Sequence, residues 1–396
     1  MRTLLLTGPG GSGRTTVAAA TALSAARGGH RTLLISADRA GTLGAVGADQ
    51  ANLTVRGLAP GDEFRDDLLA LQNRASSALD LLGAGRLEGE ELTPLPGSDE
   101  LALLRALRDA GQSAYDTVVV DLPPAPRALA VLALPEQLRR YLRRLLPPER
   151  QAARALRPML GRIAGVPMPS AWLYETAARW DTELAAAQAV IEAPGTTVRL
   201  VAEPGPAGAD AVRATATGLA LQGLRTDALH ANRVLPADTA DTWFAGLIAQ
   251  QRKTLDAWQE TYGECLLPLP HLGRDPRGAD DLAALAVPVP AGAPEPVRWP
   301  VVDALADDGV LVWHIPLPGA VREELGLIRR GDELVVTAGP FRRMVTLPSV
   351  LRRCTVAGAG LREGELRVRF APDPDLWPRT GGTGNRRSGN VEGTNP

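Results

Sequence analysis

Cysteine is nearly absent from this sequence of 396 residues, which contains only Cys265 and Cys354. Two distant cysteines exclude a disulfide framework, and they leave no CxxC pair for a zinc or redox site. Lysine is scarcer still, because Lys253 is the single lysine among 43 basic residues. Arginine therefore carries nearly all of the positive charge, even at a loop position where a lysine is expected.

An excess of charge and long apolar runs are also missing. The 45 acidic residues balance the basic ones to a formal net charge of −2, so the basic footprint of nucleic-acid binding is absent. No segment approaches the ~18 uncharged apolar residues that a membrane span needs. The run Leu4-Leu5-Leu6 is too short for a secretory signal. We expect a cytoplasmic protein without a nucleic-acid partner and with at most peripheral membrane association.

The chain nevertheless has the composition and length of an ordered protein with two domains, since 45% of its residues are hydrophobic and 22% are charged. Near the N-terminus, Thr3–Thr7 reads as a strand, Gly8–Gly13 as a loop, Arg14–Arg27 as a helix and Arg31–Ser36 as a strand. This order predicts a βαβ unit and a parallel sheet. Further strands are expected at Thr117–Val120, Val198–Ala202, Thr226–Ala231 and Cys265–Leu269.

The glycine loop, Gly8–Gly13, fits the phosphate-loop pattern G-x-x-x-x-G-K-[ST], except that Arg14 replaces the lysine. Glycines let main-chain N–H groups converge on an anion, and the following helix directs its positive end at it. The Thr15 hydroxyl can bind Mg²⁺. Arginine carries the same charge on a larger planar fork, so we expect phosphate binding without fast turnover. The predicted nucleotide-binding residues here are Gly8, Gly10, Gly11, Ser12, Gly13, Arg14, Thr15 and Thr16.

Between Pro135 and Ile191 the apolar residues repeat at helical spacing. One face carries Leu138, Tyr141, Leu142, Leu145 and Leu146, and a second such face carries Leu156, Met159, Leu160 and Ile163. These amphipathic helices have two readings, core packing with a solvated arginine face or a groove for an apolar partner.

After the proline-rich linker Pro288–Pro300 the apolar period changes to two, which predicts a small all-β domain. Expected strands are Val310–Ile315, Glu333–Thr337 and Arg343–Leu347, and Leu361–Phe370 reads as a hairpin that turns at Glu363-Gly364. The tail from Pro378 is rich in Gly, Asn and Arg and is expected to be disordered.

Together these motifs resemble the arsenical-pump ATPase family, which includes the ATPases that target tail-anchored membrane proteins. The family is part of the deviant P-loop group, whose loop reads GKGGVGKTT where this chain has GPGGSGRTT at residues 8–16. Its two switch segments are similar to SADRAGTL at residues 36–43 and DLPPAPRALA at residues 121–130. Its adenine-contacting NRVLP recurs at residues 232–236. Residues 301–371 look like the small-heat-shock-protein-like domain of some bacterial members.

The resemblance implies an α/β fold with a P-loop NTPase parallel sheet flanked by helices, a helical insertion and a small C-terminal all-β, alpha-crystallin-like domain. It divides the chain into an ATPase-like domain at residues 1–290 with the insertion at about 135–191, a linker at 291–300, the β domain at 301–375 and a tail at 376–396. It also implies ATP and Mg²⁺ as cofactors. Asp38 would position the attacking water, Thr15 and Asp121 would hold the metal, and Asn232 would read the adenine edge.

The catalytic motifs depart from those of the family. Pro9 replaces the signature lysine that reaches across the dimer, while Pro126 and Arg127 replace the glycine and histidine of the second switch. Proline fixes φ, so Pro126 should stiffen a segment that normally moves with nucleotide state. Clustered cysteines for arsenite are missing, and so is the CxxC of zinc-clamped dimers.

Three functions remain open. The first is an ATP- and Mg-binding protein with weak hydrolysis that acts as a nucleotide-gated binder of hydrophobic helical clients. The second is a catalytically degenerate partner subunit of an intact paralogue. The third is a chaperone-like interaction protein that acts through its β domain. The expected assembly is a homodimer or a heterodimer with a paralogue.

Overall fold

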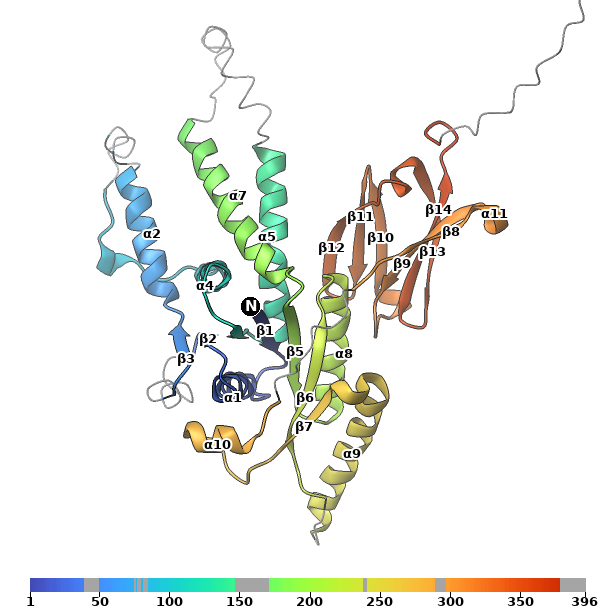
Figure 1. Cartoon of the computed structure of the whole chain (residues 1–396). Coiled ribbons are helices and arrows are strands. Elements are labelled where there is room, and N and C mark those ends of the chain that lie inside the picture. The colour runs from blue at the N-terminus through green and yellow to red at the C-terminus, as the bar shows by residue number, and fades with distance from the viewer. Residues whose placement is uncertain are drawn as a thin grey trace, which may run out of the picture. The chain divides into compact units, whose positions relative to one another are not determined.

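The computed structural model describes residues 1–38, 50–74, 76, 80, 85–146, 171–237, 241–288 and 297–377. The chain divides into two compact units (Figure 1). Unit 1 holds Met1–Arg298 together with the short segment Leu317–Ala320, whereas unit 2 holds Trp299–Pro316 and Val321–Pro396. Among the described residues, no helix is both long and apolar enough to cross a lipid bilayer.

A seven-stranded sheet forms the centre of unit 1, in the order β3-β2-β4-β1-β5-β6-β7. Every pair of neighbouring strands in it is parallel. The carboxyl ends of parallel strands therefore meet at one edge, where α/β proteins bind their ligands. The strands are β1 Arg2–Thr7, β2 Thr32–Ser36, β3 Leu53–Gly57, β4 Thr117–Asp121, β5 Thr196–Ala202, β6 Thr226–Val234 and β7 Leu266–Pro270.

Helices supply the crossover connections that parallel strands require. They are α1 Arg14–Arg27, α2 Pro60–Arg74, α4 Ser98–Gly111, α5 Ala125–Leu145, α7 Ala171–Ile191, α8 Pro206–Leu221, α9 Thr242–Tyr262 and α10 Gly278–Ala284, with 3₁₀ turns η1 Gly89–Glu91 and η2 Gly263–Cys265. The small alanine side chains of α1 are almost all buried. The helix ends at Arg27, and Gly29 then takes a φ of 87°, a left-handed conformation that favours glycine.

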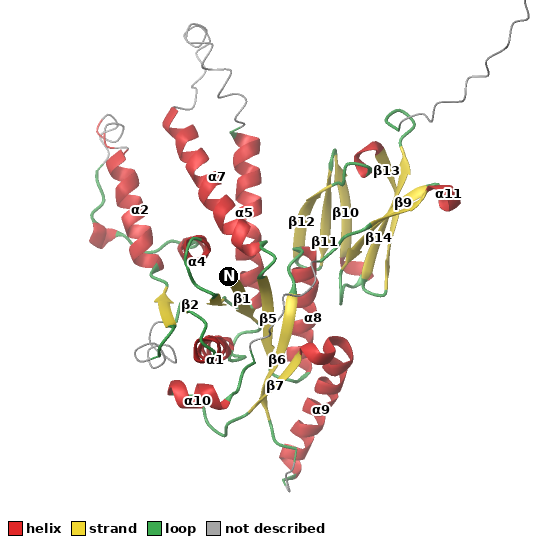
Figure 2. Ribbon diagram, viewed as in Figure 1, coloured by secondary structure: helices red, strands yellow, loops and turns green. Residues whose placement is uncertain are grey.

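Helices lie on both sides of this sheet (Figure 2). Leu4, Leu6 and Val119 belong to a core cluster that also contains residues of α1 and α10. Leu5 and Val120 alternate with them, so they point to the opposite face, and they are fully buried as well. Burial on both faces explains why the strands read as continuous apolar runs.

Unit 2 consists of a four-stranded sheet, β13-β14-β9-β8, and a three-stranded sheet, β10-β11-β12. All strand pairs in the two sheets are antiparallel. Glu363 and Gly364 join β13 to β14 with φ values of 52° and 71°, as a two-residue hairpin turn requires. The elements are β8 Val301–Ala304, α11 Leu305–Asp308, β9 Val310–Pro316, η3 Arg322–Glu324, β10 Leu325–Arg330, β11 Glu333–Ala338, β12 Phe341–Thr346, η4 Leu351–Arg353, β13 Cys354–Arg362 and β14 Glu365–Pro372.

The expected fold class is confirmed, with a parallel sheet flanked by helices and a small antiparallel β unit. The helical pattern expected from Pro135 is preceded by ten further helical residues, because α5 begins at Ala125 and contains Pro135 in its interior. Strands β3, β8 and β10 are not anticipated from the sequence. The expected helix around Met159, most of the linker, part of the first switch and the tail lie outside the described residues.

Candidate functional site

The glycine loop connects β1 to α1 at the carboxyl edge of the sheet. A Cβ on Gly8 would lie 1.9 Å from the carbonyl oxygen of Val201, so only glycine fits there. Gly13 has a φ of 86°, and its Cβ would lie 2.3 Å from the side-chain nitrogen of Asn232. The first N–H groups of α1 have no acceptor within the helix, and they carry its positive end. The loop and helix start therefore form a site suited to an anion.

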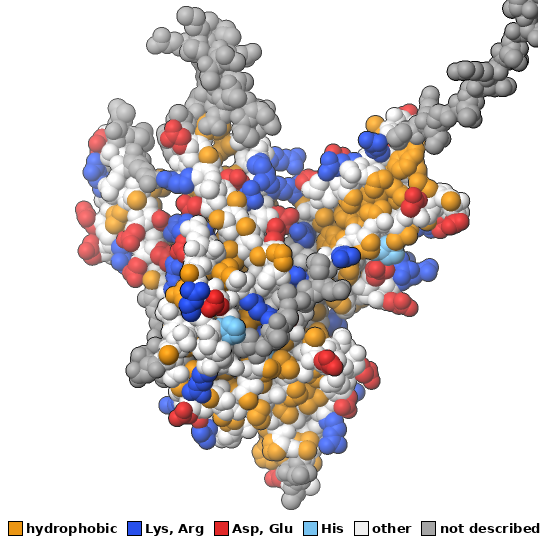
Figure 3. Space-filling view, in the orientation of Figure 1, with side chains coloured by type: hydrophobic (Ala, Val, Ile, Leu, Met, Phe, Trp, Pro, Cys, Tyr) orange, Lys and Arg blue, Asp and Glu red, His pale blue; other side chains and the backbone are white. Residues whose placement is uncertain are grey.

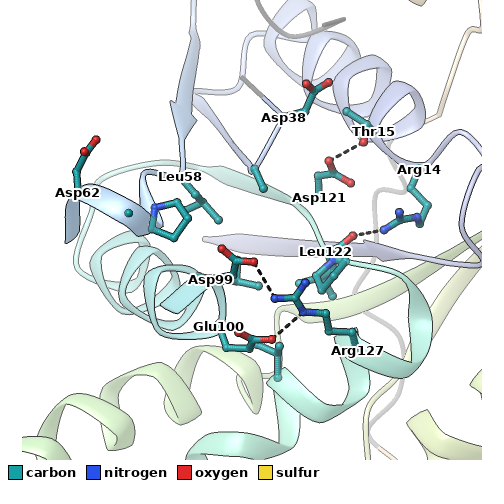
Figure 4. A pocket seen from close by; sticks show the side chains of 16 residues that line it. Arg14, Thr15, Asp38, Leu58, Asp62, Asp99, Glu100, Asp121, Leu122 and Arg127 are labelled. Atoms are coloured by element: carbon teal, nitrogen blue, oxygen red, sulfur yellow. Dashed lines mark hydrogen bonds and ion pairs between the residues drawn. The ribbon is translucent and has the colours of Figure 1, made fainter. Parts of the chain in front are cut away.

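Asp121, the last residue of β4, accepts hydrogen bonds from two hydroxyl groups, and Figure 4 shows the one from Thr15. Thr15 Oγ1 donates to Asp121 Oδ2 at 2.8 Å, and Ser36 Oγ donates to the same oxygen at 2.7 Å. The main-chain N–H of Asp38 in turn donates to Ser36 Oγ at 3.1 Å. The start of α1, the end of β2 and the end of β4 thus meet at one carboxylate.

The other oxygen of this carboxylate, Asp121 Oδ1, is buried and has no hydrogen-bond partner among the described residues. Burial raises the pKa of Asp121, while the bonds from Ser36 and Thr15 and the charge of Arg14 act in the opposite direction. An orphaned carboxylate oxygen next to a loop hydroxyl is the donor set that Mg²⁺ prefers. Thr15 and Asp121 therefore fit the metal site expected from the sequence.

Arg14 does not extend freely over the loop. Its Nη1 donates to the main-chain oxygen of Leu122, directly after β4, and its buried Nε has no partner among the described residues. Burial lowers the pKa of Arg14, and the charge of Asp121 opposes that effect. The arginine that replaces the expected lysine thus binds the start of the second switch segment.

Arg127, in the first turn of α5, forms two ion pairs with the first turn of α4 (Figure 4). Its Nε lies 2.7 Å from Glu100 Oε1 and its Nη2 lies 2.8 Å from Asp99 Oδ2. The bond to Arg127 lowers the pKa of Glu100. The sequence analysis did not predict this link. The adjacent acids Asp99 and Glu100 are the feature of the sequence that could have indicated a basic partner. We name it the α4–α5 clamp.

A cavity of about 540 Å³ connects the carboxylate cluster with the clamp. Its charged lining residues are Arg14, Asp38, Asp62, Asp99, Glu100, Asp121 and Arg127. Acidic groups outnumber the arginines, so a polyphosphate would enter this cavity more readily together with a cation than alone. The cavity therefore suits a metal-bound nucleotide better than a bare anion.

Asn232, expected to contact adenine, lies at the end of β6 and is almost fully buried. Its Nδ2 donates to the main-chain oxygen of Ser12 at 2.8 Å, and this bond links the glycine loop to β6. A second cavity of about 240 Å³ is lined by Gly13, Thr16 and Asn232. The sequence-predicted residues thus gather in the loop and in two cavities that share the start of α1.

A third region lies far along α5, where α5 packs against α7 (Figure 1). Arg139 Nε lies 3.0 Å from Asp181 Oδ1, which links the two helices. Beyond this pair, a cavity of about 290 Å³ is lined by Leu142, Tyr174 and small residues of α7. Leu145 is 77% exposed at the end of α5. The predicted face of α5 is therefore only partly packed.

Comparison with protein families matches two models along the chain. Residues 1–289 match the family described as anion-transporting ATPase, ArsA. Residues 308–370 match the HSP20-like domain found in ArsA. The first match covers more than half of the chain and contains the glycine loop and the carboxylate cluster.

Similar proteins cover nearly the whole chain. "Uncharacterized protein SCO2128" of Streptomyces coelicolor is 68% identical over 96% of this chain and 100% of its own length. "Protein Rv2184c" of Mycobacterium tuberculosis is 34% identical, covering 95% of this chain and 97% of its own length. "Putative arsenical pump-driving ATPase 1" of Aquifex aeolicus is 23% identical, covering 93% of this chain and 99% of its own length.

Proposed function

The chain belongs to the ArsA family of anion-transporting ATPases, and we propose that it binds ATP with Mg²⁺ and hydrolyses it slowly. The observation that carries this proposal is the convergence of Thr15 and Ser36 on Asp121 beside the glycine loop. The orphaned Oδ1 of Asp121 supports metal binding at the same place. Bound Mg²⁺ would neutralise charge on the phosphate oxygens.

In this proposal each residue has a separate task. The glycine loop and the start of α1 bind phosphate oxygens through main-chain N–H groups. Asp38, which borders the same cavity as Thr15 and Asp121, orients the attacking water. Asn232 borders the second cavity, where its amide contacts the adenine edge.

Slow hydrolysis follows from the two replaced lysines. Arg14 Nη1 is bonded to the Leu122 carbonyl, which holds the guanidinium against the second switch segment. Its planar fork is also larger than the ammonium group that the family places between the β- and γ-phosphates. Pro9 offers no charge at all to an opposing site.

We further propose that nucleotide state controls the binding of hydrophobic helical clients near the end of α5. This helix starts with the second switch and ends at Leu145, about 30 Å away at 1.5 Å per residue. The partly unpacked surface around Leu142, Leu145 and Tyr174 offers apolar area at that end. A shift at the start of α5 would therefore reach the client surface through one rigid element.

Calorimetric titration with ADP and ATP, with and without Mg²⁺, tests the nucleotide site. We expect micromolar, Mg-dependent binding that Asp121→Ala abolishes, and slow turnover in the same sample. Asp116→Ala is the matched control, because Asp116 pairs with Arg31 on the exposed surface. Absence of binding in the wild-type chain would reject the proposal for the isolated protein.

Anisotropy of a labelled 20-residue apolar helical peptide tests the client surface. We expect Leu145→Glu to weaken binding at least about fivefold, because it places a charge on the apolar contact. Arg144→Glu, one residue earlier on the same helix, should leave binding within about twofold because exposed charges contribute little. Equal affinities for the wild type and Leu145→Glu would exclude this surface.

The alternative function is a pseudo-ATPase subunit that pairs with an intact paralogue, and Pro9 favours it. A paralogue with a lysine at this position could complete the site of this chain, whereas this chain could not return the contribution. Mixing the purified chain with such a relative should then produce one active site per dimer. A stable homodimer with two equally active sites would contradict this alternative.

A further inference from the structure

Unit 2 contains a basic trough on the outer face of its four-stranded sheet. The trough has a volume of about 570 Å³, and its lining includes Arg362, Arg367, Arg369 and His314. On β14 the side chains of Leu366, Val368 and Phe370 alternate with Arg367 and Arg369 and are buried on the other face. The trough therefore lies on the side of the sheet that does not face the core of unit 2.

The floor of the trough is formed by β13, where small residues replace side chains of ordinary size. Gly358 lies opposite Arg369, and Gly360 lies opposite Arg367. A Cβ on either glycine would meet no atom within 4 Å. The space above both glycines is thus open, and the arginines of the neighbouring strand border it.

The cationic groups follow the strand at every second residue. Arg369 lies in the row of Gly358, and Arg367 and His314 lie in the row of Gly360. Arg362 lies in the next row, opposite Glu365. Rows two residues apart are about 7 Å apart along a strand. An extended peptide presents the side chains of one face at the same interval.

Two acidic groups, Glu365 and Asp308, offset part of the charge of the three arginines. Glu365 accepts from Arg367 at 2.8 Å and lies 2.9 Å from His314 Nδ1, so Arg367 and His314 share one carboxylate. Asp308 lies 4.0 Å from Arg369. Arg362 is exposed and has no ion pair among the described residues.

We propose that this trough binds an extended acidic peptide with carboxylates at alternate positions. Carboxylates of the peptide meet Arg369, Arg367 and Arg362, and the open floor over Gly358 and Gly360 accommodates the acidic side chains that cross β13. β13 is an edge strand of its sheet, so its outer main-chain groups are available to an extended chain in a way that nucleic acid cannot use. The tail of this chain is an unsuitable occupant, because it carries Arg379, Arg386 and Arg387 against a single acid, Glu392.

Fluorescence anisotropy with the full chain at low salt tests the proposal. The probe is a fluorescein-labelled peptide of ten residues in which glutamate and threonine alternate. The reference is a peptide of the same composition with all glutamates in one block. We expect the alternating peptide to bind at least about tenfold more tightly, since only its carboxylates match the spacing of the rows.

Three variants separate charge, shape and general surface effects. Arg362→Glu with Arg369→Glu should weaken binding of the alternating peptide at least about tenfold, by replacing attraction with repulsion. Gly360→Leu should also weaken it, because it fills the trough and leaves every charge in place. Arg330→Glu, on the exposed part of β10 in the other sheet, should bind like the wild type.

Thermal unfolding of each variant shows whether unit 2 remains folded. If the double variant unfolds, the binding measurement with Gly360→Leu still tests the proposal. Equal affinities for the wild type, the double variant and Gly360→Leu would overturn the proposal. Equal binding of the alternating and block peptides would overturn the spacing argument. A ten-nucleotide poly-dT that binds as tightly as the alternating peptide would assign the trough to polyanions in general and reject the peptide.

Discussion

Single residues decide how the glycine loop behaves, and Arg14 has the largest effect because it occupies the place of the family lysine. Its guanidinium is bonded to the carbonyl of Leu122 and is partly buried. In the proposed function the loop therefore contributes its backbone to a phosphate, while Arg14 is bonded within the protein.

We predict that Arg14→Lys raises ATP turnover at least about tenfold, because a compact ammonium group stabilises charge on the transferring phosphate. Steady-state hydrolysis at saturating Mg-ATP measures the effect. Arg27→Lys, the same exchange at the end of α1, should leave the rate unchanged. A tenfold gain in Arg27→Lys or none in Arg14→Lys would show that the arginine is not the limiting feature.

The α4–α5 clamp is a second feature at this scale. We predict that Arg127→Ala speeds amide exchange in the first turn of α5, because it removes two ion pairs, at 2.7 and 2.8 Å, that hold this turn to α4. Hydrogen exchange of residues 125–131 measures it. The pair is half exposed, so we expect an increase of only about two- to fivefold. Arg144→Ala, near the other end of the same helix, is the control.

At the level of elements, patterns with strong local signals are well predicted. The helix Arg14–Arg27 and the turn at Glu363-Gly364 appear as expected, because a glycine loop, an alanine-rich stretch and a two-residue turn are local features. β3 is missed because only Leu53 of its five residues is buried. β3 lies at the edge of the sheet and is held by its pairing with β2, which the residues of β3 alone do not indicate.

The same distinction applies to the candidate site. Thr15, Asp38 and Asp121 are found from the sequence, because each occupies a fixed place in a motif next to a strand or loop. The bond from Arg14 to Leu122 and the α4–α5 clamp are not found, since both depend on which segments the sheet brings together. Chain separations of 108 and 28 residues leave no periodic signal for such contacts.

Strand β6 contains an unusual buried group, His230, whose two ring nitrogens have no hydrogen-bond partner among the described residues. Burial, aided by the charge of Arg199, lowers its pKa to about 3. The folded protein therefore keeps this histidine neutral while the unfolded chain takes up a proton below about pH 6.5. Stability is thus unaffected above that pH and falls as the pH decreases from 6.5 towards 3.

We predict that His230→Leu removes this loss, so that its free energy of unfolding drops by about 2 kcal/mol less than that of the wild type between pH 7 and pH 5. At pH 7 the variant should be as stable or more stable, because an apolar group replaces two unsatisfied polar atoms. Urea unfolding at several pH values measures both effects. The exposed His30→Gln should retain the wild-type slope, and an identical slope for His230→Leu would refute the argument.

At the scale of the whole molecule, the division into units does not follow the chain strictly. The segment Leu317–Ala320 belongs to unit 1, although the residues on both sides of it belong to unit 2. Thr217 Oγ1 of α8 donates to the Pro318 carbonyl at 2.6 Å, and Leu317 is fully buried. Unit 1 is therefore completed by residues that lie beyond its last helix and beyond β9.

We predict that a chain ending at Arg298 unfolds at a lower temperature than unit 1 in the full protein. The loss of the buried Leu317 side chain costs about 2 kcal/mol, which corresponds to about 2–4 °C for a unit of this size. Differential scanning calorimetry of both chains provides the comparison. In the full chain, Leu317→Ala should reproduce most of the shift and the more exposed Val321→Ala should not. An unchanged melting temperature would show that unit 1 is complete without the segment.

The bond between Arg14 and Leu122 also has a consequence for ligand occupancy. Where phosphate binding requires the guanidinium to turn away from Leu122, the arrangement with this bond competes with the nucleotide. If the arrangement without this bond is populated about 1% of the time, the apparent dissociation constant rises about a hundredfold above the intrinsic one. The fraction of protein with bound nucleotide then varies steeply with nucleotide concentration over a range where a preorganised site would already be full.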